Sequence, residues 1–202
     1  MTDIFNSDFT LPPSVYILAP GWNGTEHYKD IPADAYVIAL NKAVLIPAAY
    51  RVKWKISAWL VFDCNAPLQD WWEYALFVAQ YKTIIFGQRV KGESTYTFRH
   101  DPICAIPYPG SLCAGSTVLG TALQLCYWFM KEWCPDCLMT CMQQKHVYLV
   151  GCDQGTRDFT GEVQYKPGHF KYAAEGIKKW EGFLAEKGIS VNRISPLEVQ
   201  SE

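Results

Sequence analysis

Short apolar runs alternate along this chain with longer stretches in which apolar residues recur every three or four positions. The short runs are bounded by Gly, Pro, Asn or Asp and predict buried strands, while the longer stretches predict helices. Such alternation is typical of a parallel sheet covered by helices rather than of a β-sandwich. The predicted strands are residues 14–20, 36–40, 57–62 and 83–86, a strand that begins at 146, and residues 190–194.

The segments between these strands predict the helices. Residues 24–34 have room for only a short helix, and Pro67 is placed to open a helix that extends to about residue 81. A long apolar helix pattern follows Gly115. Residues 168–187 predict a last helix, whose apolar positions 173, 177, 180 and 184 form one stripe. Pro196 follows the last strand and favours its place at a sheet edge.

Residues 87–112 predict no regular element, because they carry several prolines and few periodic apolar positions. A long irregular segment in a compact domain is usually functional, so we expect a lid over a binding crevice. No repeat, low-complexity stretch or composition shift marks a boundary. The sequence therefore predicts one Rossmann-like nucleotide-binding domain over residues 1–202, of the α/β class, with a mostly parallel sheet and helices on both faces.

Composition and charge narrow the classes of partner. The chain has 18 basic and 20 acidic residues, a net charge of −2, and no basic run, which argues against nucleic acid. The first residues contain no apolar core of the kind that a secretory signal needs. No segment approaches the ~20 apolar residues that a membrane span requires. We therefore expect a cytoplasmic protein without a transmembrane segment.

Two loops predict a ligand site, because ligands bind beyond the carboxyl ends of parallel strands. Gly21 and Gly24 follow the first strand and let backbone approach a ligand closely, and Asn23 between them offers an amide. This loop is neither a dinucleotide fingerprint nor a Walker loop. Asn41 follows the second strand and can bind a base or ribose, although asparagine is also a common turn former.

Asp153 ends the strand that begins at 146 and has two interpretations. Its carboxylate can hold a ribose hydroxyl, a divalent metal or a catalytic proton, or it can be a turn residue before Gly155. Trp22 lies inside the first loop, where its indole can stack on a base or a sugar ring. The other tryptophans have spacings typical of a core or of an oligomer surface, so a homo-oligomer remains an alternative.

The turn Gly115, Ser116 and Thr117 opens the long apolar helix. Unpaired N–H groups and the helix dipole favour a phosphate or carboxylate there, while the alternative is that Ser116 or Thr117 only caps the helix. His169 precedes the last helix in a loop. A histidine in that position is a candidate general base, although many such histidines are merely exposed.

Cys134, Cys137, Cys141 and His146 have the number and softness of ligands that suit tetrahedral zinc. The three cysteines fall in a segment, residues 131–145, that can be an insertion with its own structural metal, and His146 directly follows it. The alternative is that the three cysteines share one face of a continuing helix and that His146 starts a strand. A disulfide framework is not expected, because such frameworks serve small secreted domains that lack a core.

Taken in order, the segments ILAPGWNG, YVIALNKAV, WLVFD, AGSTVLGTALQL and HVYLVGCDQG, with a later Gly-His before the last helix, resemble the DUF115 and motility-accessory-factor superfamily. That superfamily is similar in its core to bacterial sialyltransferases that use CMP-sialic acid. The resemblance implies nucleotide contacts from the first loop and Asn41, and phosphate or ribose contacts from residues 115–117. It also implies that Asp153 closes the site and that His169 takes the place of the general base.

The preferred hypothesis is a nucleotide-sugar-dependent glycosyltransferase that needs no cofactor. Two departures from the family leave alternatives open: the first loop lacks the family's Gly-x-Gly-Pro-Ser order, and Gly155 stands where sialyltransferases have a tyrosine. One alternative is a magnesium-dependent pyrophosphokinase of the hydroxymethylpterin type, with Asp153, Asp158 and Asp63 as metal ligands. The other is a nucleotide-binding accessory protein without catalytic activity.

Overall fold

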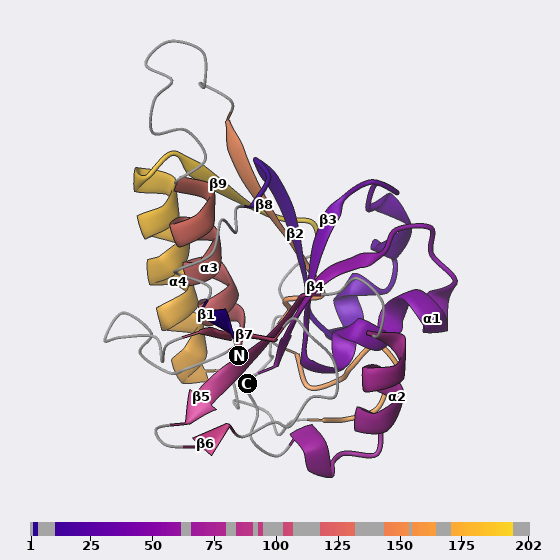
Figure 1. Ribbon diagram of the computed structural model, residues 1–202. Coiled ribbons are helices and arrows are strands. Elements are labelled where there is room, and N and C mark those ends of the chain that lie inside the picture. The colour runs from indigo at the N-terminus through magenta and orange to yellow at the C-terminus, as the bar shows by residue number, and fades with distance from the viewer. Residues whose placement is uncertain are drawn as a thin grey trace.

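The protein is described by a computed structural model that covers residues 2–3, 11–61, 66–79, 84–90, 93–94, 103–106, 118–131, 144–153, 155–164 and 171–195 (Figure 1). The helices are α1 (Ile46–Tyr50), α2 (Trp72–Val78), α3 (Val118–Lys131) and α4 (Lys171–Glu186). The strands are β1 (Thr2–Asp3), β2 (Ser14–Leu18), β3 (Tyr36–Leu40), β4 (Ile56–Val61), β5 (Ile84–Val90), β6 (Glu93–Ser94), β7 (Ile103–Ile106), β8 (Lys145–Val150) and β9 (Ile189–Arg193).

The strands form one mostly parallel sheet, as the sequence predicts. Their order is β1-β7-β5-β4-β3-β2-β8-β9, every neighbouring pair along this path is parallel, and β6 alone pairs antiparallel with β5. From β2 the chain adds β3, β4 and β5 successively on one side, and β8 then pairs with the other side of β2. The direction of winding therefore reverses between β2 and β8.

Helices cover both faces of the sheet. Figure 1 shows α3 and α4 side by side on one face and α1 and α2 on the other. Side chains alternate between two cores along each central strand: Ala58 and Leu60 join the α3 and α4 side, whereas Trp59 and Val61 join the α1 and α2 side. Because both faces are buried, these strands read as continuous apolar runs without polar alternation.

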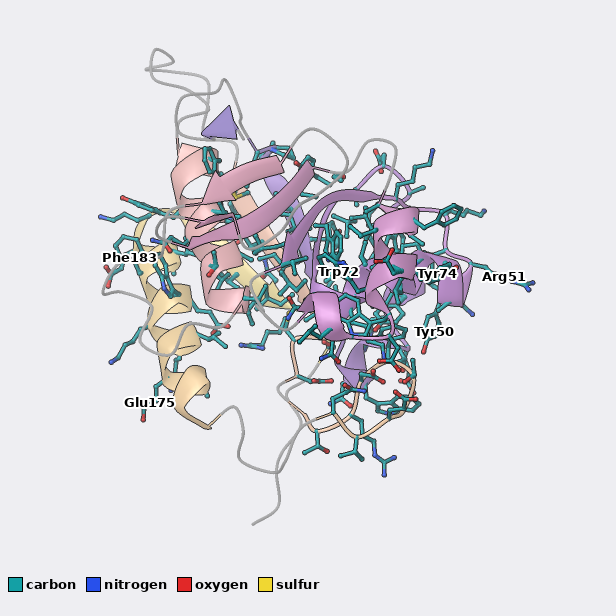
Figure 2. The ribbon with its side chains drawn as sticks, turned by 60° about the horizontal axis from the view of Figure 1, so that its bottom comes forward. Tyr50, Arg51, Trp72, Tyr74, Glu175 and Phe183 are labelled. Atoms are coloured by element: carbon teal, nitrogen blue, oxygen red, sulfur yellow. The ribbon has the colours of Figure 1, made fainter. Side chains whose placement is uncertain are left out.

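The helical crossovers are anchored by aromatic residues. Trp72 of α2 packs against Trp59 of β4, with ring centroids 5.5 Å apart, and Phe183 of α4 packs edge-on against Tyr127 of α3 at 4.9 Å. Figure 2 shows Phe183 at the left and Trp72 nearer the middle of the molecule; the two residues pack against different cores. No helix in the described ranges is long and apolar enough to cross a membrane.

Several expected boundaries need correction. Residues 66–68 form a short 3-10 turn and α2 begins only at Trp72, so Pro67 does not open that helix. The segment 87–112 is not irregular throughout, because β5 continues to Val90 and β7 pairs in parallel with it. Four apolar residues, Ile103–Ile106, are too short a run to reveal a strand by periodicity. Residues 93–94 of the same segment form β6, which pairs antiparallel with β5. The other residues of the segment lie outside the described ranges, so the lid stays a prediction.

Candidate functional site

The loop after β2 packs directly on the loop after β8, at the point where the winding of the sheet reverses. The Gly21 N–H donates to the Gly151 carbonyl at 2.9 Å. A Cβ atom on Gly21 would lie 2.1 Å from Asp153 Oδ1, and one on Gly24 would lie 2.7 Å from Gly151 Cα. Both positions therefore require glycine for the contact between the two loops, whether or not a ligand binds.

Asp153 connects these loops through its carboxylate. The side chain is 2% exposed, Oδ2 accepts the Asn23 backbone N–H at 2.6 Å, and Oδ1 accepts the Gly155 N–H at 3.1 Å. The second contact is the turn role that the sequence offered as an alternative. Since its two oxygens accept backbone N–H groups from residues 23 and 155, Asp153 fixes the position of the loop after β2 relative to the loop after β8.

Arg193 stabilises the loop that follows β8. Its Nη1 donates to the Cys152 carbonyl at 3.0 Å and its Nη2 to Glu181 Oε1 at 2.5 Å. In addition, the Gly151 N–H donates to the buried Ser195 hydroxyl at 2.8 Å. These contacts tie the loop that carries Asp153 to β9 and α4.

A hairpin over residues 155–164 lies against the loop after β2. The Gln164 N–H donates to the Thr156 carbonyl at 2.8 Å, and isolated antiparallel bridges pair Arg157 with Val163 and Gly21 with Asp158. The Phe159 N–H donates to the Pro20 carbonyl at 2.7 Å. The hairpin is thus fastened to the loop after β2.

Asp158 anchors the hairpin to the end of β3. Its Oδ2 accepts from Lys42 Nζ at 2.7 Å, and its Oδ1 accepts from the Thr160 hydroxyl at 2.5 Å. Burial by itself raises the pKa of the Asp158 carboxyl, but the hydrogen bonds from Lys42 and Thr160 outweigh burial and lower that pKa below its ordinary value. The carboxylate is therefore charged near neutral pH and paired with the ammonium group.

Asn41 directly follows β3 and has left-handed backbone, with φ of 46°, a conformation that asparagine tolerates better than most residues. Its backbone carbonyl accepts the Trp59 indole N–H at 2.8 Å. Its side-chain Oδ1 is buried and has no hydrogen-bond donor in the described part of the chain. An acceptor of this kind at a strand end is suited to a donor from a ligand.

Tyr28 lies beneath the same loops. Its ring packs edge-on against Tyr50 at 4.9 Å, and its buried hydroxyl finds no hydrogen-bond partner among the residues that the structure describes. Burial, followed by the fields of Tyr50 and Asp153, raises the pKa of Tyr28 far above its usual value. The phenol is therefore neutral at any physiological pH.

The structure brings together four of the predicted site residues: Gly21, Asn23, Gly24 and Asp153. Asn41 is linked to them through its neighbour Lys42, which contacts Asp158. His169, the turn Gly115, Ser116 and Thr117, the acid Asp63 and the cysteines Cys134, Cys137 and Cys141 lie outside the described residues.

His146 lies on β8 near its amino end, away from the crevice at the strand's carboxyl end. Its Nδ1 is 2.6 Å from the Ser190 hydroxyl, and its ring stacks on Tyr148 at 5.8 Å. His146 is thus a strand residue, as one interpretation of the sequence expected. Among the described residues no cluster of three metal-binding side chains occurs, and the zinc quartet stays a prediction.

Sequence reasoning missed Lys42 and the clamp formed by Arg193. A lysine directly after the apolar run YVIAL was a usable signal, because it stands at the ligand edge of a predicted parallel sheet. Arg193 gave no such signal, since its contacts join segments that are distant in sequence.

The fold and these loops define a mostly parallel α/β protein whose candidate site lies at a topological switch point, where sheets of this class bind ligands. Family models, curated proteins and solved structures were each compared with the chain, and none matches it.

Proposed function

We propose that this protein binds a nucleotide, in the form of a nucleotide-sugar, at the carboxyl ends of β2, β3 and β8 and acts as a glycosyltransferase. The observation that carries the proposal is the switch point between β2 and β8. Open parallel sheets bind ligands where the winding reverses, because the loops on the two sides diverge and leave a crevice there.

Two features of the candidate site support a nucleotide. Gly21 is half-buried in the loop after β2, where a phosphate can approach its backbone closely. The buried Oδ1 of Asn41 has no donor in the described part of the chain, and a ribose hydroxyl or base amino group would supply one. The ammonium group of Lys42 also lies beside the hairpin, where it is already paired with Asp158 and Glu162.

The two buried carboxylates favour glycosyl transfer over magnesium-dependent pyrophosphoryl transfer. Asp153 accepts two backbone N–H groups, and Asp158 is paired with Lys42 and Thr160. Magnesium is held by carboxylate oxygens and substrate phosphates. Asp153 is only 2% exposed, and Asp158 would have to exchange its ion pair with Lys42 for the metal. In the proposed reaction the nucleotide phosphate is the leaving group, and His169 takes the proton of the acceptor hydroxyl, the role implied by the family resemblance.

The experiment is a thermal-shift screen of CMP, CDP-sugars, UDP-sugars, GDP and ATP, each with and without magnesium. A ligand that binds only the folded state raises the melting temperature in proportion to its saturation. We expect a shift with a nucleotide or nucleotide-sugar that does not depend on magnesium. No shift with any of them contradicts the proposal, and a shift only with ATP and magnesium favours the pyrophosphokinase alternative.

A variant pair tests the placement of the site. Asn41→Gly keeps the left-handed backbone and removes the acceptor, so we expect affinity for the bound nucleotide to fall about 2- to 10-fold, the worth of one hydrogen bond. Asn192→Ala on the exposed surface of β9 is the matched control and should leave affinity unchanged. Sugar release from the donor, with and without acceptor, then separates a transferase from an accessory protein.

A further inference from the structure

We infer that Trp22 is the base-stacking platform of the crevice, and that the ligand's recognised ring is a planar nucleobase rather than a sugar. The inference rests on the proposed nucleotide site, and it adds which part of the nucleotide Trp22 recognises. It begins from the exposure of the indole: Trp22 is 43% exposed although it lies in the loop after β2, between the two glycines of the crevice floor.

The backbone of Trp22 is held on both sides. The Trp22 N–H donates to the Arg157 carbonyl at 3.2 Å, and the Trp22 carbonyl accepts from the Thr25 N–H at 3.0 Å within a short 3-10 turn. The neighbouring Gly21 is bonded to Gly151. Because the backbone is already fixed, no loop ordering is needed when a ligand reaches the indole, which favours affinity.

The hairpin leaves room for the indole. Gly161 has φ of +87°, and a Cβ atom on it would lie 3.4 Å from the Trp22 Cζ3 atom. The hairpin tip thus comes close to the edge of the six-membered ring without a side chain between them. The tip itself is fixed through the Gly161 N–H, which donates to the Asp158 carbonyl at 2.9 Å.

A large indole that is carried on a fixed backbone and is still partly open to solvent has the properties of a stacking surface. Every nucleobase offers a flat π-face to such a surface, and base-aromatic stacking tolerates different bases. Asn41 is connected to this loop through Lys42 and Asp158, and its acceptor suits a ribose hydroxyl, which leaves the base for the exposed ring. A sugar ring can also stack on an indole through its C–H groups, so the test below includes a ligand that has the sugar and no base.

The test titrates CMP, UMP, GMP, AMP and ribose 5-phosphate into wild type, Trp22→Ala and Trp22→Phe by calorimetry, with melting temperature as a check on folding. We expect Trp22→Ala to weaken nucleotide affinity about 5- to 100-fold, as the loss of one stacked base does, and Trp22→Phe to recover part of that loss. Ribose 5-phosphate lacks the base, so its affinity should be the same in all three proteins.

Tyr74→Ala is the matched control, because Tyr74 is a 52% exposed aromatic residue on α2 (Figure 2) and should leave nucleotide binding unchanged. Nucleotides that bind wild type and Trp22→Ala equally would overturn the stacking inference while the proposed function stands. An equal loss of ribose 5-phosphate affinity in Trp22→Ala would also overturn it, since the indole would then contact the sugar. If no nucleotide binds wild type, the proposed function itself fails.

Discussion

Gly21→Ala is the most direct test of the junction between the loops after β2 and β8. The added Cβ atom would meet Asp153 Oδ1 at 2.1 Å, Gly151 O at 2.3 Å and Asp153 Cγ at 2.6 Å. These are backbone and buried side-chain atoms, so the loops must separate. Overpacking costs about 1–3 kcal/mol, and a hydrogen bond lost from the buried Asp153 carboxylate adds about 1–3 kcal/mol.

The expected loss of unfolding free energy is therefore roughly 2–6 kcal/mol, by the same overpacking and hydrogen-bond costs. For a chain of this size each kcal/mol lowers the melting temperature by about 2–4 °C. The assay is thermal and urea unfolding followed by circular dichroism.

Gly182→Ala is the control for Gly21→Ala. A Cβ atom on Gly182, in α4, would have no atom within 4 Å, so alanine should raise stability by up to about 1 kcal/mol through helix propensity. A Gly21→Ala protein that melts within a degree of wild type would refute the close packing of the two loops.

Three further predictions concern buried polar groups. Asp153→Asn should lower the free energy of unfolding by about 1–3 kcal/mol even without ligand, because an amide cannot accept both backbone N–H groups; unchanged urea unfolding would contradict this. Because the pKa of Asp158 is lowered on folding, its stabilisation is complete above the unfolded pKa of about 3.9 and is lost as the pH falls through the folded pKa. The stability difference between wild type and Asp158→Asn should thus be large at pH 7 and vanish in acid, as urea unfolding at a series of pH values would show; a constant difference argues against the pair with Lys42. Tyr28→Phe should leave stability unchanged or raise it, whereas Tyr50→Phe, which loses its hydrogen bond to the Phe159 carbonyl, should lower it by about 0.5–1.5 kcal/mol; equal effects would refute the assignment.

The strands that position the site were predictable because each is buried on both faces. The apolar runs at 36–40 and 57–62 differ from β3 and β4 by at most one residue at the described ends. The short β7 and the late start of α2 were not predictable, since four residues show no period and the 3-10 turn before α2 has the same proline signal as a helix start. Local sequence patterns do not predict an element whose structure depends on pairing with a strand that is distant in sequence.

The sequence predicts which edge of the sheet carries the candidate site. It does not predict the contacts between the residues there. Parallel strands place Asn23, Asn41 and Asp153 at one edge from topology alone. The partners of Asp153 come from residue 23 and residue 155, and only the second is near enough in sequence to be anticipated as a turn. The pairing of Lys42 with Asp158 spans 116 positions, and no spacing rule reaches that far.

Some residues of the candidate site also stabilise the fold, and this determines how the function of the site must be tested. Asp153 and Asp158 hold loops in place, so loss of activity in their variants does not by itself identify a metal ligand or a catalytic acid. Asn41 Oδ1 and the Trp22 indole differ from these carboxylates, because within the described residues Asn41 Oδ1 has no donor and Trp22 is 43% exposed. Removing either takes away little that the folded chain uses for itself. A change in nucleotide affinity without a change in melting temperature at these two positions would therefore report the ligand, whereas at the carboxylates the two quantities should fall together.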